Sequence, residues 1–201
     1  LVKKEGGDLF IAQVGGWIHD VSLAWGSDYD PRLVEKRTRN FLNKYHQLTK
    51  TETDRIVECA TLHEKSGKSS NIEAKIVHDA DVIDKSGPLG IIRHVWKMTN
   101  LLEDRVLSNS NDLRKLNRHL KQRLSSLYTK TAIKIVRNLN KGKVIFFSNN
   151  KKTVKLMNTI SLLARKGKTS DIIAKNIILN KKNNFSKLLQ QQISCSYLKN
   201  Q

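Results

Sequence analysis

Residues 73–93 read EAKIVHDADVIDKSGPLGIIR and combine an apolar helical stripe with a high density of acidic side chains. The apolar positions, which we expect to be buried, are Ile76, Val77, Val82 and Ile83, and among them lie His78, Asp79, Asp81 and Asp84. A carboxylate beside a hydrophobic core costs free energy unless something neutralises it. A divalent metal ion would do so, and the stretch therefore predicts one half of a metal site.

His19 and Asp20 form the second candidate element. They lie at the end of a predicted helix over residues 8–21, whose apolar positions recur at helical spacing. An imidazole nitrogen and a carboxylate oxygen together suit Mn²⁺, Fe²⁺, Co²⁺ or Zn²⁺. The alternative is an imidazole at a helix end beside a solvated acid. A metal site requires the fold to bring this pair onto residues 73–93.

Length and composition favour a cytoplasmic protein. The 201 residues suit one domain, with room for an appendage. The apolar runs are far shorter than a membrane span, and the chain opens with no basic-then-apolar signal peptide. Cys59 and Cys195 are far apart and form no CxxC motif, so the sequence indicates neither a disulfide framework nor a zinc knuckle.

The charge is strongly uneven along the chain. Residues 1–104 contain 15 Lys and Arg against 16 Asp and Glu, whereas residues 105–201 contain 22 against two. Such asymmetry can indicate a polyanionic partner, or it can reflect drift in composition toward Lys and Asn. The basic half has few aromatic residues of the kind that stack on RNA bases. Nucleic acid is therefore a candidate partner that ranks below a small phosphorylated substrate.

Helix signals run through the whole chain, and we expect an all-α fold. Asp30-Pro31 is a helix start, and residues 49–52 and 70–73 are capping boxes. Leucines three or four apart over 113–127 indicate one buried helical face. Residues 143–147, KVIFF, could form either a strand or a buried helix. The Gly15-Gly16 pair is expected to admit another backbone at close range.

Taken together, these elements resemble the HD-domain superfamily of metal-dependent phosphohydrolases, most closely its small nucleotide pyrophosphohydrolase-like members. The resemblance covers about residues 5–95. It rests on His19-Asp20, on a helix that ends at His63, and on the spaced series Glu73, Ala74, Lys75, Asp79, Ala80, Asp81, Asp84, Gly87, Gly90 and Arg93. A weaker likeness continues into residues 127–136, which carry the Thr-x-x-Ala element of that family.

The resemblance implies an HD-type helical bundle over residues 1–140 and a basic, helical extension over residues 141–201. It implies a divalent metal ion (Mn²⁺, Mg²⁺, Co²⁺, Fe²⁺ or Zn²⁺) held by His19, Asp20 and Asp81, with Asp79 as the alternative to Asp81. The catalytic residues would be Asp20 and His63. Lys85 and Arg93 would bind substrate phosphate, although Arg93 could instead form a structural ion pair with Glu73 or Asp84.

The implied function is hydrolysis of a phosphate ester or phosphoanhydride of a small metabolite, with a nucleotide as the expected substrate. One feature of the family pattern is missing, because its first metal-ligand histidine precedes the HD pair by roughly 25–30 residues. We therefore expect an N-terminally truncated chain. The alternative function is a catalytically degenerate HD module that binds nucleotide or RNA through its basic C-terminal half.

Overall fold

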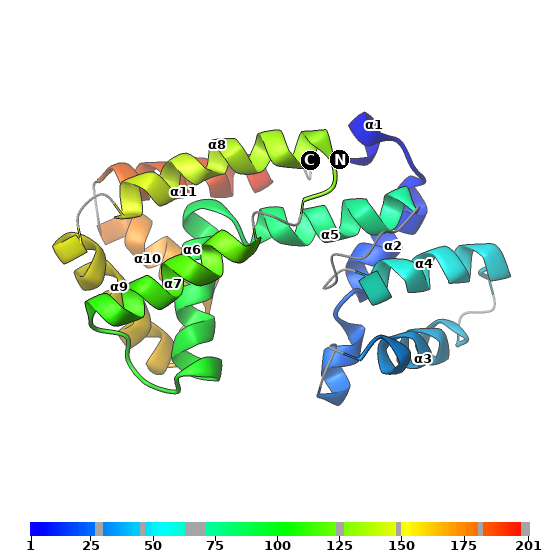
Figure 1. Cartoon of the computed structure of the whole chain (residues 1–201), viewed down its shortest axis with the longest axis horizontal. Coiled ribbons are helices and arrows are strands. Elements are labelled where there is room, and N and C mark those ends of the chain that lie inside the picture. The colour runs from blue at the N-terminus through cyan, green and yellow to red at the C-terminus, as the bar shows by residue number, and fades with distance from the viewer. Residues whose placement is uncertain are drawn as a thin grey trace. The chain divides into compact units, whose positions relative to one another are not determined.

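The structure is a computed structural model that describes residues 1–26, 30–44, 47–62, 71–123, 127–147, 150–180 and 183–197. Every regular element within these residues is a helix (Figure 1), which confirms the predicted all-α class. The residues 143–147, for which a strand was an alternative, belong to a long helix, α8 (Lys130–Phe147). No helix in the described ranges is both long and apolar enough to cross a membrane.

The helices form two compact units. The first comprises residues 1–82 and 126–133, and the second comprises residues 83–125 and 134–201. The C-terminal helices pack with residues 83–125 in the second unit, and the domain boundary expected at residue 140 stays a prediction. Each unit has its own hydrophobic core.

The first unit contains α1 (Val2–Glu5), α2 (Leu9–Ile18), the 3-10 helix η1 (Val21–Trp25), α3 (Pro31–Leu42), α4 (Lys50–Leu62) and most of α5 (Ile72–Asp84). Asp30 caps α3 by accepting a hydrogen bond from the Arg32 amide at 2.9 Å. Thr49 and Glu52 form the reciprocal capping box at the start of α4. These side chains satisfy amides that have no partner within the helix, so the predicted starts of α3 and α4 are confirmed.

A close approach of α2 to α4 organises the core of the first unit. A Cβ atom added to Gly15 would lie 2.6 Å from the Cβ of Cys59, whereas a Cβ on Gly16 would meet nothing within 4 Å. The expected close approach is therefore confirmed at Gly15 alone. Buried apolar side chains surround this contact, among them Ile11, Ile56 and Val77. Burial raises the pKa of the Cys59 thiol to about 12.

The second unit is built around α6 (Gly87–Lys97). Its other elements are the π-helix η2 (Met98–Leu102), α7 (Ser110–Arg123), most of α8, α9 (Asn150–Arg165), α10 (Ser170–Asn180) and α11 (Asn184–Tyr197). Side chains from α6, α7, α9, α10 and α11 share one core, which includes Ile92, Leu116, Met157, Ile173 and Leu189. Gln192 of α11 also accepts a hydrogen bond from the Leu89 amide at the start of α6.

Asp112, in the first turn of α7, is a buried acid that binds the loop preceding the helix. Its carboxylate accepts hydrogen bonds from the Arg105 guanidinium at 2.6 and 3.2 Å and from the amides of Ser108 and Asn109. Asn109 caps α7 by accepting from the Asn111 and Asp112 amides. The hydrogen bond from Arg105 lowers the pKa of Asp112 below its usual value, although burial alone would raise it.

We predict that Gly15→Ala lowers the free energy of unfolding by about 1–3 kcal/mol, because the new methyl group must push α2 away from Cys59. Gly16→Ala is the matched control. It adds the same methyl group in open space and should raise stability by up to about 1 kcal/mol through higher helix propensity. Urea denaturation followed by circular dichroism measures both values. Equal effects of the two substitutions would contradict the packing of α2 on α4.

Asp112→Asn should cost roughly 2 kcal/mol at neutral pH, because the substitution removes a buried charge-assisted hydrogen bond from Arg105. The folded-state pKa of Asp112 is lowered, so its stabilisation is present above the unfolded value of 3.8 and is lost as pH falls through the folded value. The difference between wild type and variant should therefore shrink below about pH 4. Asp171→Asn, at an exposed acid, should change stability by less than about 0.5 kcal/mol.

Candidate functional site

His19 lies at the C-terminal end of α2 with its imidazole orientation fixed by the backbone. Its Nδ1 is 2.6 Å from the carbonyl oxygen of Gly16. A carbonyl oxygen can only accept a hydrogen bond, so Nδ1 carries the proton and Nε2 of the neutral ring presents its lone pair. This arrangement is the usual one for metal-binding histidines, whose second ring nitrogen donates to a carbonyl or carboxylate.

Two carboxylates face Nε2 of His19. The nearest oxygen of Asp20 lies 3.2 Å from it, and the nearest oxygen of Asp81, on α5, lies 3.9 Å away. The side chain of Asp81 is 9% exposed and that of His19 is 22% exposed, whereas the Asp20 side chain is 45% exposed. The cluster is therefore buried on the α5 side and open to solvent at Asp20. The structure thus brings together the three residues that the sequence suggests as metal ligands.

The two carboxylates change the electrostatics of the imidazole. Burial lowers the pKa of His19, but the hydrogen bond that a protonated Nε2 donates to Asp20, the hydrogen bond of Nδ1 to Gly16 and the negative charges of Asp20 and Asp81 outweigh it. The pKa of His19 is raised as a result. The two carboxylates stabilise a positive charge beside Nε2 of His19. Either a proton or a metal cation can supply that charge.

Asp79, the alternative ligand, has a different role. Its carboxylate is fully buried and accepts hydrogen bonds from the Tyr128 amide at 2.9 Å and from the amide and hydroxyl of Thr129 at 2.8 and 2.6 Å. Residues two apart on a helix point about 200° from one another. Asp79 and Asp81 therefore face opposite sides of α5, and of the two it is Asp81 that faces His19.

The contacts of Asp79 give a structural role to the Thr-x-x-Ala element. The hydroxyl of Thr129 also accepts a hydrogen bond from the Ala132 amide in the first turn of α8. Glu5 adds a further cap by accepting from the Thr131 amide at 2.7 Å. Residues of α1 and α5 thus hold the start of α8 within the first unit. The sequence resemblance marked Thr129, but nothing in its pattern indicated that the partner was Asp79.

His19, Asp20 and Asp81 offer the nitrogen and oxygen atoms that divalent cations bind. The distances between these atoms limit how well one ion could fit among them. Metal–nitrogen and metal–oxygen bonds of about 2.0–2.2 Å allow two ligand atoms to lie 3.2 Å apart, as in His19 and Asp20. The 3.9 Å separation of His19 and Asp81 is near the largest separation that two such bonds to one ion allow. Across the described ranges, no group of three or more His, Cys, Asp and Glu residues lies close enough to hold a metal ion as it stands.

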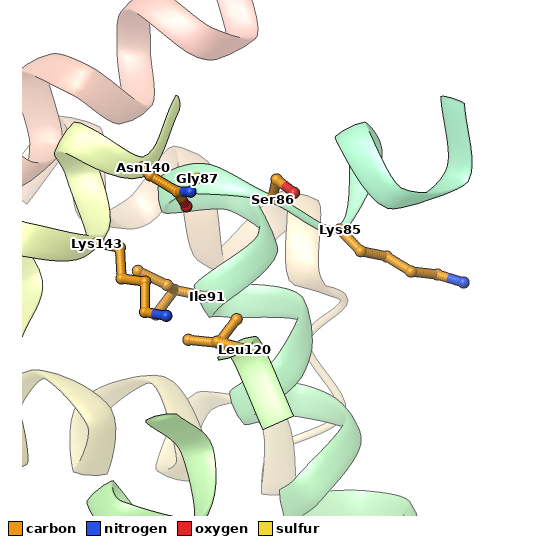
Figure 2. A pocket seen from close by; sticks show the side chains of 7 residues that line it. All are labelled: Lys85, Ser86, Gly87, Ile91, Leu120, Asn140 and Lys143. Atoms are coloured by element: carbon orange, nitrogen blue, oxygen red, sulfur yellow. The ribbon is translucent and has the colours of Figure 1, made fainter. Parts of the chain in front are cut away.

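The residues expected to bind substrate lie in the second unit. Arg93 forms an ion pair with Asp84 and also donates to the Asp84 carbonyl oxygen at 3.2 Å. The structural alternative for Arg93 is therefore observed with Asp84, while Glu73 pairs with Arg55 at 2.6 Å. Lys85 borders a small hollow, but its side chain points away from it (Figure 2). His63, the second expected catalytic residue, lies outside the described residues.

We predict that Asp79→Asn lowers the free energy of unfolding by about 1–3 kcal/mol, because an amide cannot accept all three hydrogen bonds as a carboxylate does. Asp81→Asn, the matched control on the same helix, should change stability by less than about 1 kcal/mol in the absence of metal. Thermal and urea denaturation in the presence of a chelator measure both. A larger loss for Asp81→Asn than for Asp79→Asn would contradict the structural role of Asp79.

The chain was compared with models of known protein families, with curated proteins and with solved structures, and none of the three comparisons found a match.

Proposed function

We propose that this protein is a metal-dependent phosphohydrolase that cleaves a phosphate ester or phosphoanhydride of a small metabolite, with a nucleotide as the expected substrate. The observation that carries the proposal is the convergence of His19, Asp20 and Asp81 from two separate stretches of the chain. The HD-like pattern of the sequence predicts the same three residues as metal ligands, which supports the proposal independently of the distances.

A divalent ion at this cluster would be held by Nε2 of His19 and by the carboxylates of Asp20 and Asp81. The tautomer set by the Gly16 carbonyl supports this assignment, because it directs the lone pair of Nε2 toward the two acids. The 3.9 Å separation of Asp81 and His19 is near the largest that two ligands of one ion allow. A bound ion would supply an activated water and polarise a phosphoryl oxygen.

The remaining chemistry falls to the side chains of the cluster. The carboxylate of Asp20 is the most exposed of the three, and this exposure suits it to orient an attacking water. The hydrogen bond to Gly16 holds the His19 ring in one orientation, which keeps the donor set together before substrate arrives. The ion pair of Arg93 with Asp84 counts against Arg93 as a phosphate ligand, and the proposal does not depend on it.

Metal binding provides the first test. We expect Co²⁺ or Mn²⁺ to bind the wild-type chain at one site, and His19→Ala and Asp81→Asn each to weaken binding by at least about tenfold. His119→Ala, at an exposed histidine of α7, is the control and should bind as the wild type does. Calorimetry and the visible absorption of bound Co²⁺ report binding without any need for catalysis.

Hydrolysis provides the second test. Nucleoside mono- and triphosphates should release phosphate or pyrophosphate in the presence of Mn²⁺, Co²⁺ or Mg²⁺, and a chelator should abolish the release. The same two substitutions should reduce the rate, while His119→Ala should not. The proposal fails if no metal-dependent release occurs and His19→Ala binds as much metal as the wild type.

A further inference from the structure

The two units differ sharply in charge. The first unit contains 13 Lys and Arg and 13 Asp and Glu, which leaves no formal net charge. The second contains 24 Lys and Arg against five Asp and Glu, a formal net charge of +19. The whole excess of positive charge in this protein therefore belongs to the second unit.

The acids of the second unit are already engaged. All five lie within 4 Å of an arginine or lysine of the same unit, and they are Asp84, Glu103, Asp104, Asp112 and Asp171. Four cations account for these pairs, namely Arg93, Arg105, Lys115 and Arg165. The five acids therefore cannot balance the charge of the other cations of the unit.

Six of these other cations form stripes on α7 and α8. Arg114, Arg118 and Lys121 follow a spacing of four and three residues along α7, and Lys134, Arg137 and Lys141 follow three and four along α8. All six are exposed. Residues at these spacings lie on one helical face, where like charges repel one another. Drift in composition would scatter lysines over a surface, whereas these cations are aligned.

Residues of both helices line one small hollow. Leu120 of α7 and Asn140 and Lys143 of α8 line it, together with Ile91 of α6 (Figure 2). In sequence, Lys121 of the α7 stripe directly follows the lining residue Leu120, and Lys141 of the α8 stripe directly follows the lining residue Asn140. Burial and the nearby charge of Lys121 lower the pKa of Lys143, so two lysines from different helices crowd this point.

We propose that the α7–α8 surface, defined by Arg114, Arg118, Lys121, Lys134, Arg137 and Lys141, binds the sugar-phosphate backbone of a double-helical nucleic acid. A duplex presents rows of phosphates at regular spacing, and a row of cations on a rigid helix complements such a row. A phosphate near the hollow would relieve the repulsion between Lys121 and Lys143. The inference stands apart from the metal site and from hydrolysis.

The kind of side chain on this surface favours a duplex over other polyanions. Proteins that bind single strands stack the bases on exposed aromatic rings. Among the described side chains of the second unit, Phe146 and Phe185 are buried and Trp96 and Phe147 are half-buried, so none offers such a platform. Insertion into an anionic membrane would require apolar side chains beside the cations, but Leu113, Leu116 and Leu120 of α7 are buried in the core, and Val144 is the one large apolar side chain of α8 that is exposed among those described.

Fluorescence anisotropy with a labelled DNA duplex of about 20 base pairs tests the proposal. The quadruple variant Arg118→Gln, Lys121→Gln, Arg137→Gln and Lys141→Gln removes four charges from the surface. The matched control removes four charges from exposed lysines of the turn after α9, of α10 and of α11, as Lys166→Gln, Lys168→Gln, Lys175→Gln and Lys187→Gln. Circular dichroism establishes that both variants keep the helical content of the wild type.

The proposal predicts duplex binding that weakens steeply with salt. The slope of log affinity against log salt should fall in magnitude by about three to four in the surface variant, since each phosphate contact contributes about 0.9. The control variant should keep the wild-type slope within about one. Equal losses in the two variants would show attraction to net charge alone and would overturn the proposal. So would tighter binding to a single strand of the same length, or binding to phosphatidylserine vesicles with none to the duplex.

Discussion

The buried carboxylate of Asp79 is the interaction on which the first unit and its candidate site both depend. It accepts three hydrogen bonds from Tyr128 and Thr129 and so fixes the start of α8 against α5. Because this contact fixes the rotation of α5 about its axis, Asp81 is turned to the opposite side and faces His19. A single helix thereby separates a structural acid from an acid of the candidate site within three residues. Buried hydrogen bonds of this kind are costly to break, so the orientation of Asp81 is well determined.

The features of the first unit that depend on local interactions could be predicted from the sequence. The helix starts at Asp30 and at Thr49 follow from side chains that reach amides two or three residues away. The choice between Asp79 and Asp81 could not be derived in that way, because it depends on Thr129, a residue 50 positions further along the chain. The sequence also left both Glu73 and Asp84 open as partners of Arg93, and the structure identifies Asp84.

The extent of the second unit is the part of the fold that sequence patterns described least well. The sequence interpretation places a basic extension at residues 141–201, and in the structure one core holds side chains of α6 and α7 together with those of α9, α10 and α11. Composition reports mainly on exposed positions, which are free to become basic, whereas the packing is set by Met157, Ile173 and Leu189 at buried positions. A change in composition therefore does not locate the buried positions that build the core.

The exposed and buried positions of α8 also bear on whether its charges are incidental. Ala132 and Val136 are buried, which confines the helix to one orientation, and all of its cations except Lys143 are exposed. No Asp or Glu occurs between Lys130 and Phe147 to offset them. Stability alone would favour acids three or four residues from such cations, because opposite charges at that spacing stabilise a helix. A surface that forgoes this stabilisation along its whole length is better explained by an external anion than by the requirements of folding.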